Sequence, residues 1–451
     1  MKRLRKSDAD KISHLPDDVI QRVLAFLPVK DAAKTATLSK QWQRNWGANT
    51  QLVFDGSFGR IPEEGNYASN ESKLMFQIYK ALLVRDAPIK KFVLKIPGLG
   101  RPSPDINLLV HFLAKKSVQE LALIFSDDEF NDGHPKIGRE MPSALFSACQ
   151  LKSLRLQDCD ISAAPSCFLG FSKLTHLELT NVNVESSFYS DFLPKCPLLQ
   201  DLKLFICDSD AVESHLKAEL VTPSLRVFES NVWNVCFKHT PLLSAVSIAP
   251  VDDRKYCKQS DFDVYNPDIV AAFASLPAIQ QLTVGAELLQ FFASGNVPFM
   301  LPTHLHQLKV LKLRNILLYR SLEARVLQCL IMSSPNLLKL TIEPGYVASL
   351  PPTEVIDSLQ LLLEAEDHST ASCFQCLEEF RISAIDGTQV ELDLLRFVLA
   401  TAPQLLRMFI EPAKELDLRK RHNLLKELIR FERASKQAEV VYISDDEADT
   451  L

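Results

Sequence analysis

Glycine is scarce in this chain, with 13 residues against 25 prolines. Loops that cradle phosphate groups need closely spaced glycines, because their backbone N–H groups must approach the ligand closely. The short pair Gly98-Leu99-Gly100 lacks the third glycine and a helix directly after it. The motifs GxxxxGK[ST], GxSxG and HExxH are also absent. The sequence therefore argues against nucleotide binding and the hydrolytic chemistries that these motifs carry.

Long hydrophobic runs are missing as well. No run of 18 apolar residues occurs, so no membrane span is predicted. The first residues, MKRLRKSDAD, carry charge with no apolar segment after it, which is not the pattern of a secretory signal. Ten cysteines occur at irregular spacings, and without a secretion signal we expect free thiols. We therefore expect the protein in the nucleus or cytoplasm.

Positive charge is not in excess. The formal net charge is −6, whereas proteins that bind nucleic acid in bulk usually show a strong basic surplus. Hydrophobic residues make up 47% and charged residues 24% of the 451 residues, which is an ordinary composition for a folded protein. The length allows two or three domains, or one long repeat array. We expect neither a nucleic acid nor a membrane as a partner.

Clusters of metal ligands are also absent. Cys373 and Cys376 form a lone CxxC pair, whereas a structural zinc ion needs four ligands. The acidic stretch Asp127–Asp132 leads into a possible calcium loop, but Phe130 and Arg139 stand where oxygen ligands are required. No metal, cofactor or catalytic residue is predicted, and we expect a protein that is not an enzyme.

Residues Asp10–Trp46 predict three short helices. Pro16 suits a first helical position, because its missing N–H would be unpaired there in any case. Pro28 stops this helix, and Asp31 can cap a second one over Ala32–Leu38. A third helix carries two tryptophans one turn apart, at 42 and 46.

This segment is rich in large apolar residues for its size. The first helix presents one apolar face by the 3.6-residue period: Val19, Ile20, Val23, Leu24 and Leu27. A piece of about 40 residues is near the lower limit for folding alone. We expect it to bury part of its apolar face on a partner; the alternative is an N-terminal helical cap on the rest of the chain.

The order and spacing of these residues resemble the plant F-box. The matching stretches are LPDDVI from Leu15, LAFLPVKD from Leu24 and LSKQW from Leu38. The resemblance implies docking on a Skp-type adaptor of a cullin-RING ubiquitin ligase. By position, the residues that would make this contact are Leu15, Pro16, Ile20, Leu24, Leu27, Val29, Leu38 and Trp42.

After this segment an apolar pattern repeats, with apolar residues at the first, fourth and sixth positions of each copy. Four successive copies start 23, 25 and 26 residues apart (151 to 174, 174 to 199, 199 to 225), which is the leucine-rich-repeat period. The clearest copies are Leu151/Leu154/Leu156, Leu174/Leu177/Leu179, Leu199/Leu202/Leu204, Leu308/Leu311/Leu313 and Leu337/Leu340/Ile342. Weaker copies begin at Ile89, Val118, Leu225, Leu243, Ile279, Leu377 and Leu405.

Each copy predicts a short strand that cannot bury its own apolar face, so stacked copies form a parallel sheet with a continuous core. Helical returns are expected between strands, at Asp105–Ala114, Asn266–Ala274, Ser321–Ser333 and Leu392–Ala400. A proline step such as Cys196-Pro197 ends a return before the next strand. This pattern of a proline step followed by the repeated apolar positions resembles plant F-box proteins with leucine-rich repeats; the alternative is an ordinary α/β sheet domain.

Polar insertions at 127–132, 252–263 and 346–372 are either a ligand surface or loose loops.

The C-terminal block alternates strands and helices. A strand at Cys376–Ile382 is followed by a turn at Gly387, a helix at Glu391–Ala400, a strand to Ile410, a basic helix at Leu416–Ser435 and a strand at Ala438–Ile443. This order resembles the FBD domain of plant F-box/leucine-rich-repeat proteins. Capping the open end of a repeat array suffices as its role.

The predicted fold class is α/β: a three-helix F-box, then a leucine-rich-repeat solenoid with helical returns, closed by the FBD block. The predicted boundaries are a basic tail at 1–9, the F-box at 10–49, the solenoid at 50–375, the FBD domain at 376–443 and an acidic tail at 444–451. The basic tail is either a nuclear-import signal or a solvated tail.

These resemblances imply a non-catalytic, substrate-recognition subunit of an SCF-type (Skp-cullin-F-box) ubiquitin ligase, whose repeats bind a target protein. One alternative is an F-box protein acting outside the ligase. The other is a hormone receptor with a small ligand in the solenoid. A receptor that uses inositol phosphate would need inward-facing basic residues, for which the strands offer Lys152, Arg155, Lys203, Lys309 and Lys312.

Overall fold

The structure is a computed structural model. It describes residues 12, 15–54, 67–83, 85, 87–95, 104–125, 140–161, 164–185, 187–206, 218–232, 235–249, 270, 273, 276, 278–293, 296–318, 320–345, 374–414 and 416–443. The chain forms two compact units, Met1–Leu216 and Lys217–Leu451. Several predicted features lie outside the described residues: both tails, the three polar insertions, Cys373 and almost all of the predicted helix Asn266–Ala274.

The first unit begins with the three predicted helices, α1 (Asp17–Phe26), α2 (Val29–Thr35) and α3 (Lys40–Ala48). Two details of the prediction were wrong. Pro16 is the cap residue before α1 rather than its first residue, and Asp31 lies inside α2 instead of capping it. The fixed φ of Pro28, −53°, starts α2 directly after it. Asp31 instead pairs with Lys34 at 2.8 Å on the exposed side of the helix.

A parallel sheet follows in the same unit, and its strands are paired in sequence order. The strands are β1 (Gln51–Phe54), β2 (Lys91–Lys95), β3 (Glu120–Ile124), β4 (Ser153–Ile161), β5 (His176–Val184) and β6 (Asp201–Ile206). The repeated leucines stand in one row, because Leu154 pairs with Leu177 and Leu177 with Leu202. All three are buried, so the predicted core of the repeats is confirmed here.

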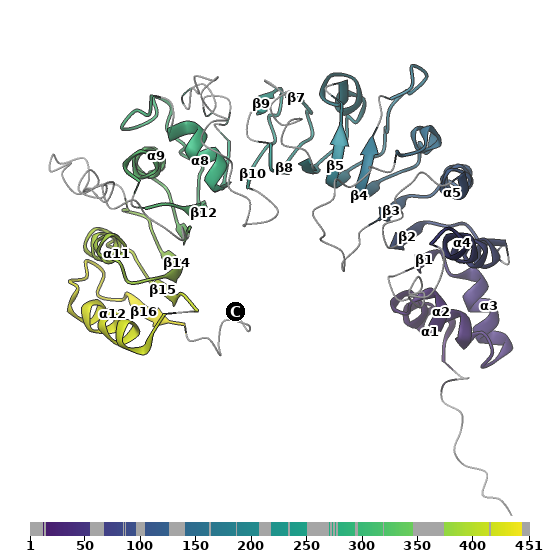
Figure 1. Cartoon of the computed structure of the whole chain (residues 1–451), viewed down its shortest axis with the longest axis horizontal. Coiled ribbons are helices and arrows are strands. Elements are labelled where there is room, and N and C mark those ends of the chain that lie inside the picture. The colour runs from purple at the N-terminus through teal and green to yellow at the C-terminus, as the bar shows by residue number, and fades with distance from the viewer. Residues whose placement is uncertain are drawn as a thin grey trace, which may run out of the picture. The chain divides into compact units, whose positions relative to one another are not determined.

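The returns between these strands cover one face of the sheet (Figure 1). They are α4 (Tyr67–Leu83), α5 (Pro104–Lys115), the 3-10 helices η1 (Ser143–Ser147) and η3 (Leu193–Lys195), and the π-helix η2 (Phe188–Phe192). Where the returns are short, aromatic side chains fill the space. Phe168 lies 5.1 Å from Phe146 and 5.5 Å from Phe192 between ring centroids. Such ring pairs add to the free energy gained by burying their area.

In the described part of the second unit, eight parallel strands lie in the order β8-β10-β11-β12-β13-β14-β15-β16, beside a separate parallel pair, β7-β9. The strands are β7 (Ala218–Val221), β8 (Val227–Ser230), β9 (Val235–Lys238), β10 (Ala245–Ile248), β11 (Gln281–Val284), β12 (Val310–Ile316), β13 (Lys339–Pro344), β14 (Glu379–Ile385), β15 (Arg407–Pro412) and β16 (Glu439–Tyr442). The described helices of this unit include α8 (Ala286–Ala293), α9 (Ser321–Met332), α11 (Gln389–Thr401) and α12 (Leu418–Arg430). The predicted α/β class is therefore confirmed.

The C-terminal block keeps the predicted order of strands and helices. Gly387 adopts a φ of +73°, which glycine reaches without steric cost. Thr388 and Glu391 then form a reciprocal capping box that starts α11. The basic helix is shorter than predicted, because Asp417 caps its start by accepting a hydrogen bond from Lys420 N, and the chain is extended at Phe431.

One buried carboxyl group gives the second unit a pH-dependent stability. Glu323 is 1% exposed, and its Oε2 accepts a hydrogen bond from the Leu317 N–H at 2.8 Å. Burial raises the pKa of Glu323 from 4.5 to about 7, although the Leu317 N–H and Arg320 both favour the charged form. Because the folded pKa is raised, the stabilisation is complete below the unfolded pKa and is lost as the pH rises through about 7.

Replacing this carboxyl by an amide should remove the part of the pH dependence that Glu323 contributes. Between pH 5 and 8, the wild-type protein is expected to lose about 2.5 kcal/mol of stability relative to the Glu323→Gln variant. Urea unfolding at both pH values measures this difference. Parallel pH profiles for the two proteins would contradict the assignment.

Candidate interaction surfaces

The eight F-box residues predicted to meet an adaptor divide into two groups. Four of them form the core between α1, α2 and α3: Ile20, Leu24, Val29 and Trp42. These side chains are buried, so their direct role in this structure is to hold the three helices together. The other four are at least partly accessible: Pro16 and Leu38 are exposed, and Leu15 and Leu27 are half-buried.

The surface of the F-box also carries apolar side chains that the prediction did not include. Phe26 is 90% exposed at the end of α1, and Val23 is 38% exposed one turn before it. Val19, Val23 and Phe26 recur at helical spacing and form a second apolar stripe beside the buried one. This spacing was the signal for Phe26 in the sequence. We call the accessible apolar set the F-box surface: Leu15, Pro16, Val23, Phe26, Leu27 and Leu38.

Polar contacts fix the start of the F-box on α3. Asp17 Oδ1 accepts hydrogen bonds from Asn45 Nδ2 at 2.7 Å and Gln41 Nε2 at 3.0 Å. These hydrogen bonds lower the pKa of Asp17 below its usual value. Gln41 Nε2 also donates to the Leu15 carbonyl oxygen at 2.9 Å, and the Trp42 indole donates to the Ile12 carbonyl oxygen at 3.3 Å. The segment that carries Leu15 and Pro16 is therefore held in place before any partner binds.

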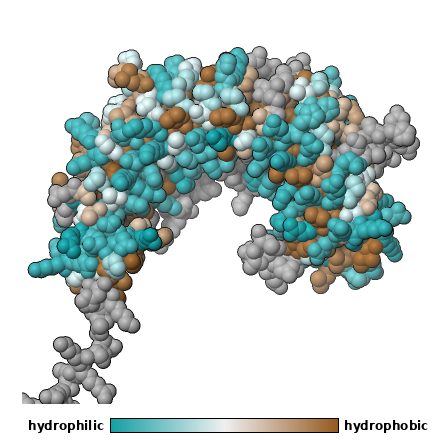
Figure 2. All heavy atoms as spheres, turned by 180° about the vertical axis from the view of Figure 1, so that it is seen from behind, coloured by the Kyte–Doolittle hydropathy of each residue, from teal (hydrophilic) through white to brown (hydrophobic). Residues whose placement is uncertain are grey.

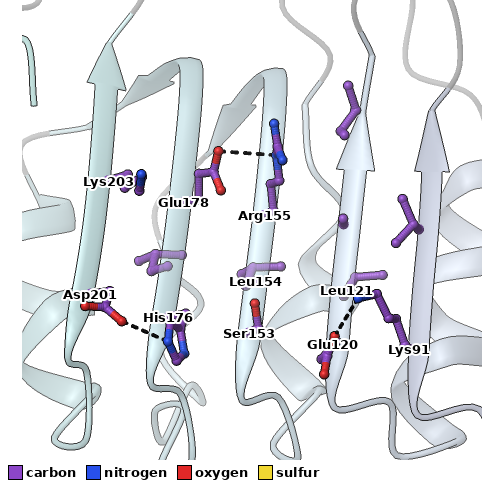
Figure 3. Close-up of a pocket in the computed structure, with 14 residues that line it drawn as sticks. Lys91, Glu120, Leu121, Ser153, Leu154, Arg155, His176, Glu178, Asp201 and Lys203 are labelled. Carbon is purple, nitrogen blue, oxygen red and sulfur yellow. Dashed lines mark ion pairs between the residues drawn. The ribbon is translucent and has the colours of Figure 1, made fainter. Parts of the chain in front are cut away.

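A second surface lies on the sheet of the first unit, where a hollow of about 330 Å³ spans β2 to β6. We call it the strand face. Figure 3 shows its side chains projecting from neighbouring strands. Its residues are Lys91, Val93, Glu120, Ala122, Ile124, Ser153, Arg155, His176, Glu178, Asp201 and Lys203.

Charges on the strand face are matched across neighbouring strands. Lys91 pairs with Glu120 at 3.1 Å, and Arg155 pairs with Glu178 at 3.3 Å (Figure 3). In both cases the two residues are register partners, so the pairing follows directly from the parallel sheet.

His176 Nε2 continues this pattern and lies 2.8 Å from Asp201 Oδ2, again between register partners. The ion pairs are partly exposed, so each contributes little to stability. Their effect is to present alternating charges at the spacing of the strands.

The basic residues predicted for an anion-binding ring belong to different units, and those of the first unit do not form a positive surface. Arg155 and Lys203 lie on the strand face, which also holds three carboxylates. Lys312 pairs with Glu343 at 2.5 Å in the second unit, and the exposed Lys152 and Lys309 stand just before their strands. An inositol phosphate needs an excess of positive charge, and the described strand face does not supply it.

The described residues offer neither a metal centre nor a membrane-spanning helix. No group of three or more His, Cys, Asp or Glu side chains in the described ranges could hold a metal ion. None of the described helices has the length and apolar character to span a membrane. The visible surface is mostly hydrophilic, with hydrophobic residues in separate patches (Figure 2).

The three-helix F-box and the parallel repeat strands define the class of F-box/leucine-rich-repeat proteins. An F-box domain model matches residues 12–47, and a model of the leucine-rich repeats of FBD-associated F-box protein At5g56370 matches residues 106–342. The second match covers more than half of the chain. The chain belongs to the family of FBD-associated F-box proteins with leucine-rich repeats, and neither model describes an enzyme.

Relatives of the same architecture match along almost the whole chain. F-box/FBD/LRR-repeat protein At1g13570 of Arabidopsis thaliana is 28% identical over 443 residues, covering 97% of this chain and 99% of its own. At4g26340, of the same type and organism, is 25% identical over 458 residues, covering 96% and 100%. Among solved structures, leucine-rich repeat-containing protein LegL7 from Legionella pneumophila is 14% identical, covers 62% of this chain and 90% of its own, and gives a TM-score of 0.28, too low to define the fold.

Proposed function

We propose that this protein is the substrate-recognition subunit of an SCF-type ubiquitin ligase. The observation that carries the proposal is a folded F-box whose accessible apolar side chains include Phe26 and Leu38. Scattered single exposed apolar residues are normal, but a segment of this size with several large ones favours a partner. The partner of the F-box surface is a Skp-type adaptor, through which the chain joins a cullin-RING ligase.

The repeats bind the target protein in this proposal, and the strand face is its docking surface. A target segment with charges complementary to Glu120, Arg155 and Lys203 could exchange the exposed ion pairs of the strand face for intermolecular ones. Such complementarity chiefly sets specificity and association rate. The balanced charge favours a protein target over a small anionic ligand.

The chain itself makes and breaks no bonds in this function. It holds the target near the ubiquitin-charged enzyme, so that an encounter between two molecules becomes effectively intramolecular. Proximity labelling with a variant lacking the F-box, which would hold targets without delivering them to the ligase, identifies those targets.

Truncating the F-box surface should weaken adaptor binding. Leu15→Ala/Pro16→Ala and Phe26→Ala are each expected to reduce recovery of a Skp-type adaptor, since losing an anchor at an interface centre costs about 2 kcal/mol or more. Quantitative co-purification from a reconstituted mixture measures the loss. Phe76→Ala, which removes a ring that is 63% exposed on α4, is the matched control and should bind normally.

Unchanged adaptor recovery by both F-box variants would contradict the proposed docking. Circular dichroism of each variant is the control that tests whether it remains folded. A loss of adaptor binding in Phe76→Ala as well would show that the effect is not specific to the F-box surface.

A further inference from the structure

The F-box joins the repeats without a flexible linker. The helix α3 ends at Ala48 and β1 begins at Gln51, so only Asn49 and Thr50 lie between them. The Thr50 carbonyl oxygen accepts hydrogen bonds from Lys90 N at 2.9 Å and Lys91 N at 3.1 Å. Thr50 is thus tied to the start of β2, on which the strand face begins.

A buried arginine reaches into this junction from the segment between α4 and β2, and we call α4, this segment and β2 together the first repeat. Arg85 follows α4 and is only 6% exposed. Its Nη1 donates to the Asn49 carbonyl oxygen at 2.7 Å, and its Nη2 donates to the Trp46 carbonyl oxygen at 2.7 Å. Its guanidinium carbon lies 4.0 Å from the centre of the Trp46 ring. The side chain therefore caps the end of α3 and covers its last tryptophan.

Burying this charge is costly for the fold. Burial alone lowers the pKa of Arg85 to about 10, and no carboxylate within the described ranges opposes this shift. The Arg85 Nε is also buried without a hydrogen-bond partner in the described part of the chain. Burying a cation without a counter-ion costs free energy that its hydrogen bonds must offset. The hydrogen bonds of Arg85 join the end of α3 to the first repeat. The C-terminal end of a helix also attracts positive charge, which favours the guanidinium at this position.

We propose that Arg85 is a positioning residue that locks the F-box onto the first repeat. The lock fixes the direction in which the strand face presents a target relative to an adaptor bound to the F-box. This second statement rests on the proposed function, whereas the lock itself does not. Lysine cannot replace the planar fork of arginine at a site with two separate acceptors.

The direct test measures the spread of distances between the F-box and the repeats. Donor and acceptor dyes are attached through non-canonical azide side chains at the exposed positions Thr37 and Ser172, and single-molecule energy transfer is recorded. The wild-type protein should give one narrow distribution. Arg85→Met, which keeps the length but removes the donors, should broaden it or add a second population. Arg85→Lys should broaden it less.

Arg44→Met is the matched control, because Arg44 is an exposed arginine on α3, the helix whose end Arg85 caps. This substitution should leave the distance distribution narrow. Distributions for Arg85→Met and Arg85→Lys that superimpose on the wild-type distribution would overturn the proposal.

Adaptor binding is measured on the same set of proteins, so that a failure of the proposed ligase function can be told apart from a failure of the proposed role of Arg85. If Arg85→Met keeps adaptor binding and loses the narrow distribution, the F-box is folded but no longer locked, as proposed. If the wild-type protein binds no adaptor but Arg85→Met still broadens the distribution, the lock stands and the ligase function falls. If Arg85→Met does not fold, Arg85→Lys alone decides: a broadened distribution supports the lock, and a wild-type distribution overturns it.

Discussion

Removal of residues 376–451 is expected to produce a protein that self-associates. The deletion takes away β14, α11, β15, α12 and β16 together. It leaves β13 as an edge strand that has lost the register pairs Leu340–Phe380 and Ile342–Ile382. An uncovered sheet edge with apolar neighbours pairs readily with another copy. Size-exclusion chromatography and a thermal melt of the truncated protein measure the effect.

The alternative is that the C-terminal block is an independent domain. The truncated chain would then elute as a clean monomer with an unshifted melt, and the capping role would be ruled out. In the structure, β14 continues the parallel sheet directly from β13, which favours capping. The F-box surface lies in the other unit, so adaptor binding should survive in the isolated F-box segment.

Truncation of the repeated leucines should give the largest loss of stability from single substitutions. Leu202 in β6 and Leu311 in β12 are fully buried, one in each unit. Each change to alanine removes buried methyl groups and leaves a cavity, which costs roughly 2–5 kcal/mol. Leu169→Ala is the matched control, because this leucine is 96% exposed and should lose almost nothing.

Chemical denaturation of Leu202→Ala, Leu311→Ala and Leu169→Ala measures the loss of stability in each variant. Two transitions can occur because the chain has two units, so the midpoint of each transition is compared separately. Equal midpoints for Leu202→Ala and Leu169→Ala would contradict a core built from the repeated positions.

The repeat pattern was sufficient to predict most of the sheet, because each copy places the same three apolar positions inward. The repeat pattern was a weaker predictor where strands carry few leucines. The strand β1 has only Leu52, Val53 and Phe54 as its apolar residues, and no copy of the pattern was assigned to it. The helices α4 and α8 were also not predicted, although Leu74, Ile78 and Leu82 of α4 are buried at helical spacing. The pair β7-β9 lacks the repeat pattern and depends on tertiary contacts.

The F-box motif identified the segment but did not show which residues face outward. In the three-helix F-box, α1 needs one apolar stripe for the core, and it carries a second apolar stripe at the surface. Ile20 and Leu24 lie on the first stripe, whereas Val23 and Phe26 lie on the second. Both stripes have the same 3.6-residue period, so spacing alone cannot separate them.

The role of Arg85 was beyond sequence reasoning for a different reason. Its acceptors are the backbone carbonyl groups of Trp46 and Asn49, and every residue type carries such a group. No pattern of side chains marks the pair in advance.

The most direct measurement of the central claim is the recovery of a Skp-type adaptor and a cullin with the wild-type chain. The proposed function predicts that both co-purify with the wild-type chain, and that both are lost together in the Leu15→Ala/Pro16→Ala variant. Adaptor recovery without cullin would indicate an F-box protein that acts outside the ligase. Recovery of neither protein by the folded wild-type chain would contradict the account.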